Sequence, residues 1–189
     1  MKTALLALLA TGLVAAAPGQ DRAQPGDGYL AGPTLPGFEI GHTDGDGQQW
    51  IMEQVPRGES VHDWTRMITT QRFNGIAGQT TPKDYLGVIA RSLPQSCKGA
   101  HASDPVTFTV SGRPAAKMRA DCPNNPETHL PETFEILAIS GPRDLHVRQV
   151  AFRYVPSPED IAWAESYLAS TTFCPPLSKT PACRILTPD

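Results

Sequence analysis

Apolar and polar side chains alternate with a period of two where the folded part of the chain is predicted to begin. Phe38 and Ile40 alternate with polar neighbours, and Trp50 and Met52 resume the alternation after the turn-forming residues 44–47. A period of two is typical of a β-strand with one buried face. The two runs on either side of a glycine-containing turn therefore predict a β-hairpin.

Two helices are predicted to follow this hairpin. Ser60 comes after a turn at residues 56–59 and offers an N-cap for the first helix. Thr81 and Pro82 offer a cap and a first helical residue for the second helix, which Pro94 is expected to end. The apolar faces would consist of Val61, Trp64 and Ile68, with Met67 at the edge, in the first helix and of Tyr85, Leu86, Ile89, Ala90 and Leu93 in the second.

The second half of the chain has strand-like patterns and ends in a helix. From Pro105 the period returns to two, and a turn at residues 111–114 sends the chain back as a second hairpin. A later run is apolar on both faces, as in a central strand. The predicted elements are strands at 106–110, 118–120, 134–139 and 145–154, and a helix capped by Ser157 with Pro158 at its first position.

The predicted element order is β-β-α-α-β-β-β-β-α, with short links between neighbouring strands. This order predicts the α+β class, with a mainly antiparallel sheet covered by helices. A length of 189 residues suits one such domain. We predict a single domain over residues 37–189, preceded at residues 18–36 by a flexible arm with few large apolar residues.

The first 17 residues have the pattern of a secretory signal peptide. A lysine at position 2 precedes an apolar and small-residue run over residues 4–17. This run is shorter than the ~20 residues that a membrane-spanning helix needs. Cleavage is predicted after residue 16 or 17, or nearer residue 23. The pattern predicts a periplasmic or secreted protein that does not span a membrane.

Four cysteines in a chain predicted to be exported indicate disulfide bonds rather than metal ligands. Three pairings are possible. We favour the pair Cys97–Cys122 and the pair Cys174–Cys183, because each pair is close in sequence and spans residues that can turn. Zinc is the alternative, but the chain has no C-x-x-C pair and no histidine near Cys174 or Cys183.

Charge and motif content narrow the possible partners. The chain has 16 basic and 19 acidic residues, a formal net charge of −3, so it lacks the basic excess with which nucleic-acid-binding proteins neutralise phosphates. It contains no glycine-rich phosphate loop and no G-x-G-x-x-G sequence. We therefore expect no nucleic-acid partner, no cofactor and no metal.

Residues 56–71, PRGESVHDWTRMITTQ, carry the clearest resemblance. They are similar to a short motif of uncharacterised secreted bacterial proteins, in which a turn and Gly-Glu-Ser or Gly-Glu-Thr precede a helix with Trp-Thr and a final Gln. More distantly, the element order resembles the PsbP/Mog1-like α/β/α sandwich. This resemblance implies an accessory or binding role and transfers no active-site residue.

The same stretch has a structural and a functional interpretation. In the structural one, Gly58 permits the turn and Trp64 anchors the predicted helix against the sheet. In the functional one, Glu59, His62 and Arg66 present a polar binding site beside the first hairpin. The structural interpretation is favoured.

A partial calcium-loop pattern overlaps the first hairpin. Asp44, Asp46 and Gly47 are followed by Glu53 at the twelfth position of such a loop. His42 would occupy the first ligand position, and no helix is predicted before it. A hairpin turn explains the same residues with fewer assumptions, so we favour the turn.

The five histidines, at positions 42, 62, 101, 129 and 146, lack the spacing of a zinc hydrolase. His62 and His146 are the two on predicted elements, His62 beside Asp63 and His146 two residues before Arg148. A serine hydrolase would need a serine, a histidine and an acid to converge, and no G-x-S-x-G sequence is present.

The leading hypothesis is therefore a periplasmic or secreted accessory or binding protein, a disulfide-stabilised monomer whose partner is an envelope protein or a small ligand. The alternative is a secreted hydrolase with an unrecognised site near the first predicted helix. It requires a pocket in which a histidine, a carboxylate and a serine or threonine meet. A structural component of the cell envelope is a third hypothesis.

Overall fold

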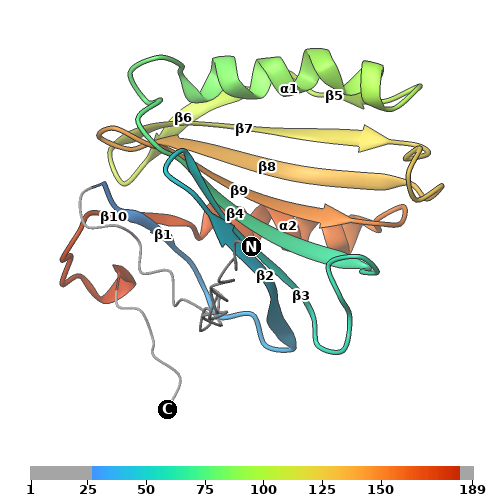
Figure 1. The fold of residues 1–189 in the computed structure, drawn as a ribbon, viewed down its shortest axis with the longest axis horizontal. Coiled ribbons are helices and arrows are strands. Elements are labelled where there is room, and N and C mark those ends of the chain that lie inside the picture. Colours follow the sequence, from blue (N-terminus) through green and yellow to red (C-terminus); the bar gives the residue numbers. More distant parts are fainter. Residues whose placement is uncertain (1–26, 184–189) are drawn as a thin grey trace, which may run out of the picture.

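Residues 27–183, the part of the chain that the computed structural model describes, form an eight-stranded sheet, a two-stranded sheet and two α-helices (Figure 1). The bounds are β1 Tyr29–Ala31, β2 Phe38–Gly45, β3 Gln49–Pro56, β4 Arg66–Phe73, α1 Pro82–Ser96, β5 His101–Ala102, β6 Val106–Val110, β7 Arg113–Cys122, β8 Glu132–Ser140, β9 Leu145–Phe152, α2 Pro158–Ala169 and β10 Thr172–Cys174, followed by a short 3-10 helix, Pro181–Cys183. The predicted signal peptide at residues 1–17 lies outside the described residues.

The large sheet has the strand order β2-β3-β4-β9-β8-β7-β5, and β6 also pairs with β7. All the strand pairs of the described residues are antiparallel. Both predicted hairpins are present, as β2–β3 and β6–β7, and the predicted central strand is β8, between β7 and β9. The α+β class with a mainly antiparallel sheet is thus confirmed.

The two helices pack against different sets of core residues. Helix α1 contacts β7 and β8, whereas α2 contacts β8 and β9. Along β9, Val147 and Ala151 belong to the cluster around α1, and Val150 and Phe152 belong to the cluster around α2. Side chains at even and odd positions of a strand point to opposite faces, so each helix covers its own face of the sheet. No helix among residues 27–183 is long and apolar enough to cross a membrane.

Both helices begin where their caps predict. Thr81 accepts a hydrogen bond from the Asp84 backbone N–H at 3.1 Å, and Ser157 forms a reciprocal capping box with Asp160. The predicted end of α1 is wrong, because Pro94 lies inside the helix, which continues to Ser96. A proline in the last turn removes only one backbone hydrogen bond, so the helix can accommodate it there.

The first predicted helix is also wrong. Residues 66–73 form strand β4, and residues 57–65 form a turn and a loop. The strand lies between β3 and β9, and Met67 and Ile68, on opposite faces, are both buried. A strand buried on both faces loses the simple alternation, and the apolar spacing of Val61, Trp64 and Ile68 then imitates a helix.

The prediction of a flexible arm over residues 18–36 is wrong for its described end. Strand β1 lies in this segment and pairs with β10, placing Leu30 opposite Phe173. Asp27 is 1% exposed. The arm was predicted from local composition, which cannot show pairing between residues more than 140 positions apart.

Arg148 fixes β1 against the large sheet. Its guanidinium donates hydrogen bonds to the backbone oxygens of Leu30 at 2.9 Å and Ala31 at 3.1 Å, and to the Thr171 hydroxyl at 3.3 Å. It also lies over the Tyr167 ring, 5.7 Å from the centroid. Burial lowers the pKa of Arg148 from its ordinary value. The buried charge is satisfied by these oxygens rather than by a carboxylate.

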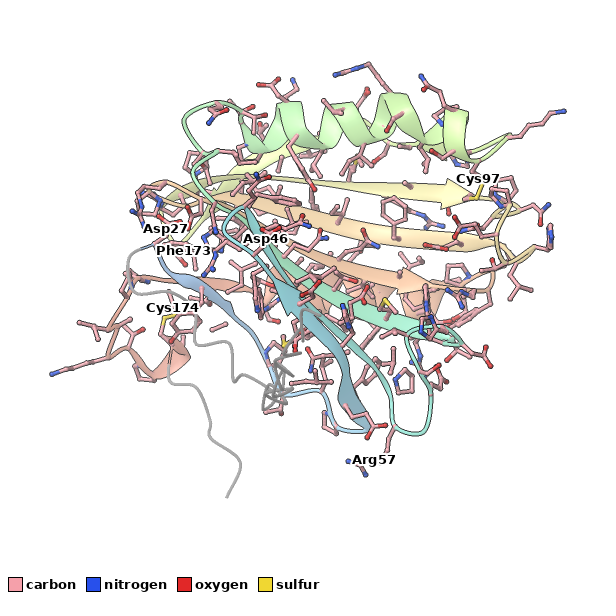
Figure 2. All side chains as sticks on the ribbon, in the orientation of Figure 1. Asp27, Asp46, Arg57, Cys97, Phe173 and Cys174 are labelled. Atoms are coloured by element: carbon pink, nitrogen blue, oxygen red, sulfur yellow. A yellow bond between two sulfur atoms is a disulfide. The ribbon has the colours of Figure 1, made fainter. Side chains whose placement is uncertain are left out.

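Both predicted disulfides are present. Cys97–Cys122 joins the C-terminal end of α1 to the end of β7, and Cys174–Cys183 joins β10 to the 3-10 helix that follows it. Figure 2 shows Cys97 and Cys174 at opposite ends of the sheet. The described residues contain no free cysteine.

Candidate functional site

A concave part of the sheet beside α1 forms a groove of about 370 Å³, here called the sheet groove. Helix α1 packs mainly on β7 and β8 and reaches β4 at Phe73, through Tyr85, so it leaves most of β3 and β4 and the adjoining half of β9 uncovered on this face. The floor comes from these three strands, and the walls come from the loop before β4 and the loop between β7 and β8. Its lining includes Ile51, Glu53, Val61, Trp64, Met67, Thr69, Gln71, Asn125, Glu127, Thr128, Glu132, Gln149, Ala151 and Arg153.

Polar side chains interrupt the apolar face at the floor of the groove. Glu53 pairs with Thr69 on β4, and Thr69 pairs with Gln149 on β9, so the three form a row across neighbouring strands. Gln71 is two residues along β4 and therefore points to the same face. We call Glu53, Thr69, Gln71 and Gln149 the polar cluster.

The polar cluster has hydrogen-bonding capacity that the fold does not use. Within residues 27–183, none of its four side chains makes a hydrogen bond or ion pair with another described residue. Their nitrogen and oxygen atoms are not among the buried polar atoms that lack a hydrogen-bond partner, so water reaches them in the open groove, and a ligand with polar groups can replace that water. The collection of these four side chains in a concavity is the strongest mark of a binding site in the described structure.

One wall of the groove is a stacked pair, Trp64 and Arg153. The Arg153 guanidinium lies 4.0 Å from the centroid of the Trp64 ring, and it donates a hydrogen bond to the His62 backbone oxygen at 3.0 Å. Its Nε atom is buried and has no hydrogen-bond partner among the described residues. Stacking over a tryptophan holds the cation in a fixed position at the edge of the groove.

The opposite wall is the loop between β7 and β8. Asn125 donates a hydrogen bond from its side-chain amide to the Glu132 carboxylate at 3.0 Å, and its backbone pairs with Leu130 and His129. These bonds keep the loop compact at the groove. The lining contains three acidic side chains, Glu53, Glu127 and Glu132, and one basic side chain, Arg153, so it carries more negative than positive charge.

No hydrogen bond or ion pair of the described residues joins the three residues predicted as a polar site, Glu59, His62 and Arg66. Both Glu59 carboxylate oxygens accept hydrogen bonds from Thr65, at 2.6 Å from its N–H and 2.8 Å from its hydroxyl. Arg66 lies over the Trp163 ring of α2, 5.7 Å from the centroid. His62 is exposed and contributes its backbone oxygen to Arg153. Glu59 and Arg66 thus stabilise the loop and the α2 side of the sheet.

The groove is lined by other residues of the same 56–71 motif: Val61, Trp64, Met67, Thr69 and Gln71. A helical period of 3.6 over this segment does not place the last three on one face. With a period of two, positions 67, 69 and 71 share one face. The signal was the β-branched, polar run Ile-Thr-Thr-Gln, which is more typical of a strand than of a helix.

Of the partial calcium-loop residues, Asp46 and Gly47 form the β2–β3 turn favoured from the sequence, whereas Asp44 lies in β2 and Glu53 in β3. Asp46 accepts hydrogen bonds from the backbone N–H groups of Gln48 at 2.7 Å and Gln49 at 2.8 Å. These bonds lower the pKa of the Asp46 carboxyl. The aspartate therefore acts as a turn residue, closing the hairpin.

A buried cluster of Asp27, Asp144 and His146 has the ligand types of a metal site, with atoms within 4.8 Å of one another. Its oxygens are already engaged: Asp27 accepts hydrogen bonds from the Arg143 and Asp144 backbone N–H groups and contacts His146 Nε2 at 3.1 Å. Burial lowers the pKa of His146, against the effect of Asp27. His146 packs edge-on against the Phe173 ring, with 5.2 Å between the ring centroids, and Figure 2 shows Asp27 beside Phe173, so we assign this buried cluster a structural role.

Glu135 on β8 is the carboxyl group with the most unusual pKa. It is 6% exposed, and burial raises its pKa to about 7, with Arg119 and Lys117 of β7 opposing the rise and Glu165 of α2 and Asp121 adding to it. Arg119 is itself held by Asp121, at 2.9 Å. Because the pKa is raised, the folded state binds a proton on Glu135 more tightly than the unfolded chain does. The protonated carboxyl therefore favours the folded state, and this contribution to the free energy of unfolding is lost as the pH rises through about 7.

Replacing this carboxyl tests that assignment. The substitution Glu135→Gln is expected to raise the free energy of unfolding by about 2 kcal/mol more at pH 8 than at pH 4, because glutamine stays neutral at both values. Urea denaturation at the two pH values measures the difference. Glu165→Gln is the control and should show a smaller effect. Equal effects of Glu135→Gln at both pH values would contradict the assignment.

The sequence matches no protein-family model and no curated protein.

Proposed function

We propose that the protein is a periplasmic or secreted accessory protein that binds a small polar ligand in the sheet groove. The observation that carries this proposal is the polar cluster, four side chains that line a concavity and make no hydrogen bond within the described structure. Two disulfides support an oxidising compartment, and the N-terminal pattern supports export.

The lining suggests the chemistry of the ligand. Gln71 and Gln149 each offer both hydrogen-bond donors and acceptors, Thr69 offers a hydroxyl, and Glu53 offers only acceptors when ionised. Such a set suits a ligand with several hydroxyl, amide or ammonium groups. An apolar ligand would leave these groups unpaired and would bind poorly.

The geometry favours binding over hydrolysis in this region. The hydrolase hypothesis requires a histidine, a carboxylate and a hydroxyl to meet in a pocket near residues 60–68. His62, the histidine of that segment, is exposed, and the contact it makes with the groove is through its backbone oxygen. His146 is buried against Asp27 elsewhere in the fold. We therefore propose the binding role.

A double substitution separates the site from the fold. Gln71→Leu with Gln149→Leu is expected to change the free energy of unfolding by less than about 1 kcal/mol, because both glutamine side chains are partly exposed and make no hydrogen bond within residues 27–183. Thermal and urea denaturation measure this. A loss of more than about 1 kcal/mol would mean that the glutamines serve the fold rather than a ligand.

Ligand titration by NMR tests the binding role. Monosaccharides and free amino acids are added to the ¹⁵N-labelled protein, and amide shifts are followed. We expect at least one probe to shift amides of β3, β4 and β9 around the polar cluster, and the double leucine variant to lose that response. Gln54→Leu, on the other face of β3, is the matched control and should keep it. Shifts that the double variant retains would contradict the proposal.

A further inference from the structure

The two edges of the large sheet differ in how they are protected. Strand β2, at one edge, has an irregular register between Ile40 and His42 and carries Glu39 and Asp44. Bulges and charged side chains are the features with which proteins prevent edge strands from pairing with other chains. Strand β6, on the other side, has neither feature. Its sequence is Val-Thr-Phe-Thr-Val, without a charge, a proline or a glycine.

Strand β6 also exposes apolar surface. Val106 is 59% exposed and Phe108 is 39% exposed, and they lie on one face of the strand. Each is opposite a β7 residue, Lys117 and Ala115 respectively, and α2 does not reach them, since its main contacts are with β8 and β9. The strand therefore combines an unprotected edge with an uncovered apolar face.

The turn after β6 defines which backbone groups point away from β7. Ser111 and Gly112 both have positive φ, 51° and 73°, as in the two-residue type I′ turn, so Val110 and Arg113 form the hydrogen-bonded pair next to it. Alternation then makes Thr109 opposite Pro114 a pair without hydrogen bonds, which agrees with the missing N–H of Pro114.

The backbone N–H and C=O groups of Thr107 and Thr109 consequently point outward from the sheet. Within residues 27–183, no strand pairs with this side of β6. An edge strand with outward backbone groups and an apolar face is the usual template for β-strand addition. A strand added at this edge would pair with the outward backbone groups of β6.

We propose that this strand is β6 of a second copy of the protein. Read in either direction, the sequence of β6 is the same. In an antiparallel pair centred on Phe108, Thr107 of each copy faces Thr109 of the other, and these are the residues whose backbone groups point outward. Val106 faces Val110, and the two Phe108 side chains meet on the twofold axis.

This single contact pairs the free backbone groups of β6 and also covers its exposed apolar side chains. The outward backbone groups pair, and the exposed valine and phenylalanine side chains are covered by their equivalents. The two eight-stranded sheets would join edge to edge, with the sheet grooves on the same face of the combined sheet. The contact involves a single short strand, so we expect a reversible, concentration-dependent dimer rather than a permanent one. The proposal replaces the monomer expected from the sequence.

Single-cysteine variants test the register. A residue on a twofold axis lies close to its own equivalent, within the 4.4–6.8 Å between Cα atoms that a disulfide needs, whereas a residue two positions away lies roughly 13 Å from its equivalent. Under mild oxidation, Phe108→Cys is expected to form a covalent dimer. Val106→Cys, on the same face and more exposed, is the control and should not. Equal cross-linking of the two variants, or none of Phe108→Cys, would overturn the proposal.

Sedimentation of the disulfide-intact protein tests the hydrogen bonding. The wild-type protein is expected to shift from monomer to dimer as its concentration rises. Thr109→Pro removes an outward N–H that β7 does not use, so it should stay monomeric at every concentration while keeping its thermal unfolding transition. Thr109→Val retains the N–H and should dimerise like the wild type. A wild-type protein that remains monomeric, or a proline variant that keeps its fold and still dimerises, contradicts the β6 pairing.

Discussion

Replacing Asp27 with alanine is expected to lower the free energy of unfolding by about 4 kcal/mol. The carboxylate accepts hydrogen bonds from the backbone N–H groups of Arg143 at 2.8 Å and Asp144 at 2.9 Å, and it contacts His146 Nε2 at 3.1 Å. Alanine would leave the buried Asp144 N–H and His146 Nε2 and the part-buried Arg143 N–H without this partner, and each unpaired buried donor costs about 1–3 kcal/mol.

Urea denaturation measures this change, and Asp27→Asn is the matched control. Asparagine has the same shape and keeps one acceptor oxygen, so it should cost roughly half as much as alanine. Hydrogen exchange should also become faster in β1, which follows Asp27 directly. An alanine variant that loses less than about 1 kcal/mol would mean that Asp27 does not hold the β8–β9 turn.

Removing the Cys97–Cys122 disulfide is expected to lower the free energy of unfolding by about 3.5 kcal/mol. The bond closes a loop of 25 residues, and its loss gives the unfolded chain more conformational freedom. In the folded state it joins the end of α1 to the end of β7, and both cysteines are buried. The double substitution Cys97→Ala with Cys122→Ala makes this change without leaving a free thiol.

The second disulfide provides the comparison. Cys174–Cys183 closes a loop of 9 residues, so Cys174→Ala with Cys183→Ala should cost about 2.6 kcal/mol on the same basis. Urea denaturation of the two double variants shows which disulfide contributes more to the free energy of unfolding. A larger loss for Cys174–Cys183 would show that this bond acts mainly by holding β10 against β1 in the folded state, rather than through the unfolded chain.

Local patterns predicted most of the sheet and both caps. The hairpins β2–β3 and β6–β7 follow from alternation around turn residues, and the starts of α1 and α2 follow from Thr81–Pro82 and Ser157–Pro158. These signals lie within a few residues of the structure that they specify. The cysteine pairing was predicted for a similar reason, since each disulfide joins residues close in sequence.

Strand β4 and the N-terminal strand β1 could not be predicted in this way. Met67 and Ile68 are buried on opposite faces of β4, and polar side chains follow on both faces, so apolar and polar residues do not alternate along the strand. Strand β1 has three residues and is held by partners far along the chain, β10 and Arg148. Contacts of that sequence separation leave no local pattern.

The groove is lined by the segment that the sequence singled out, but by residues of it other than Glu59, His62 and Arg66. The 56–71 motif does supply one wall and part of the floor of the sheet groove, through Trp64, Thr69 and Gln71. The other part of the floor, Gln149, comes from β9, and the pairing of β9 with β4 is what brings it beside Thr69. A site built across paired strands cannot be assembled from one segment.

The central claim is that the polar cluster of the sheet groove binds a ligand, and native mass spectrometry of the protein isolated from the periplasmic or secreted fraction of its own cells tests it most directly. The wild-type protein and the Gln71→Leu, Gln149→Leu variant are isolated in the same way and compared. We predict an additional noncovalent mass on the wild-type protein that is absent from the variant. The same additional mass on both proteins, or on neither, would contradict the claim.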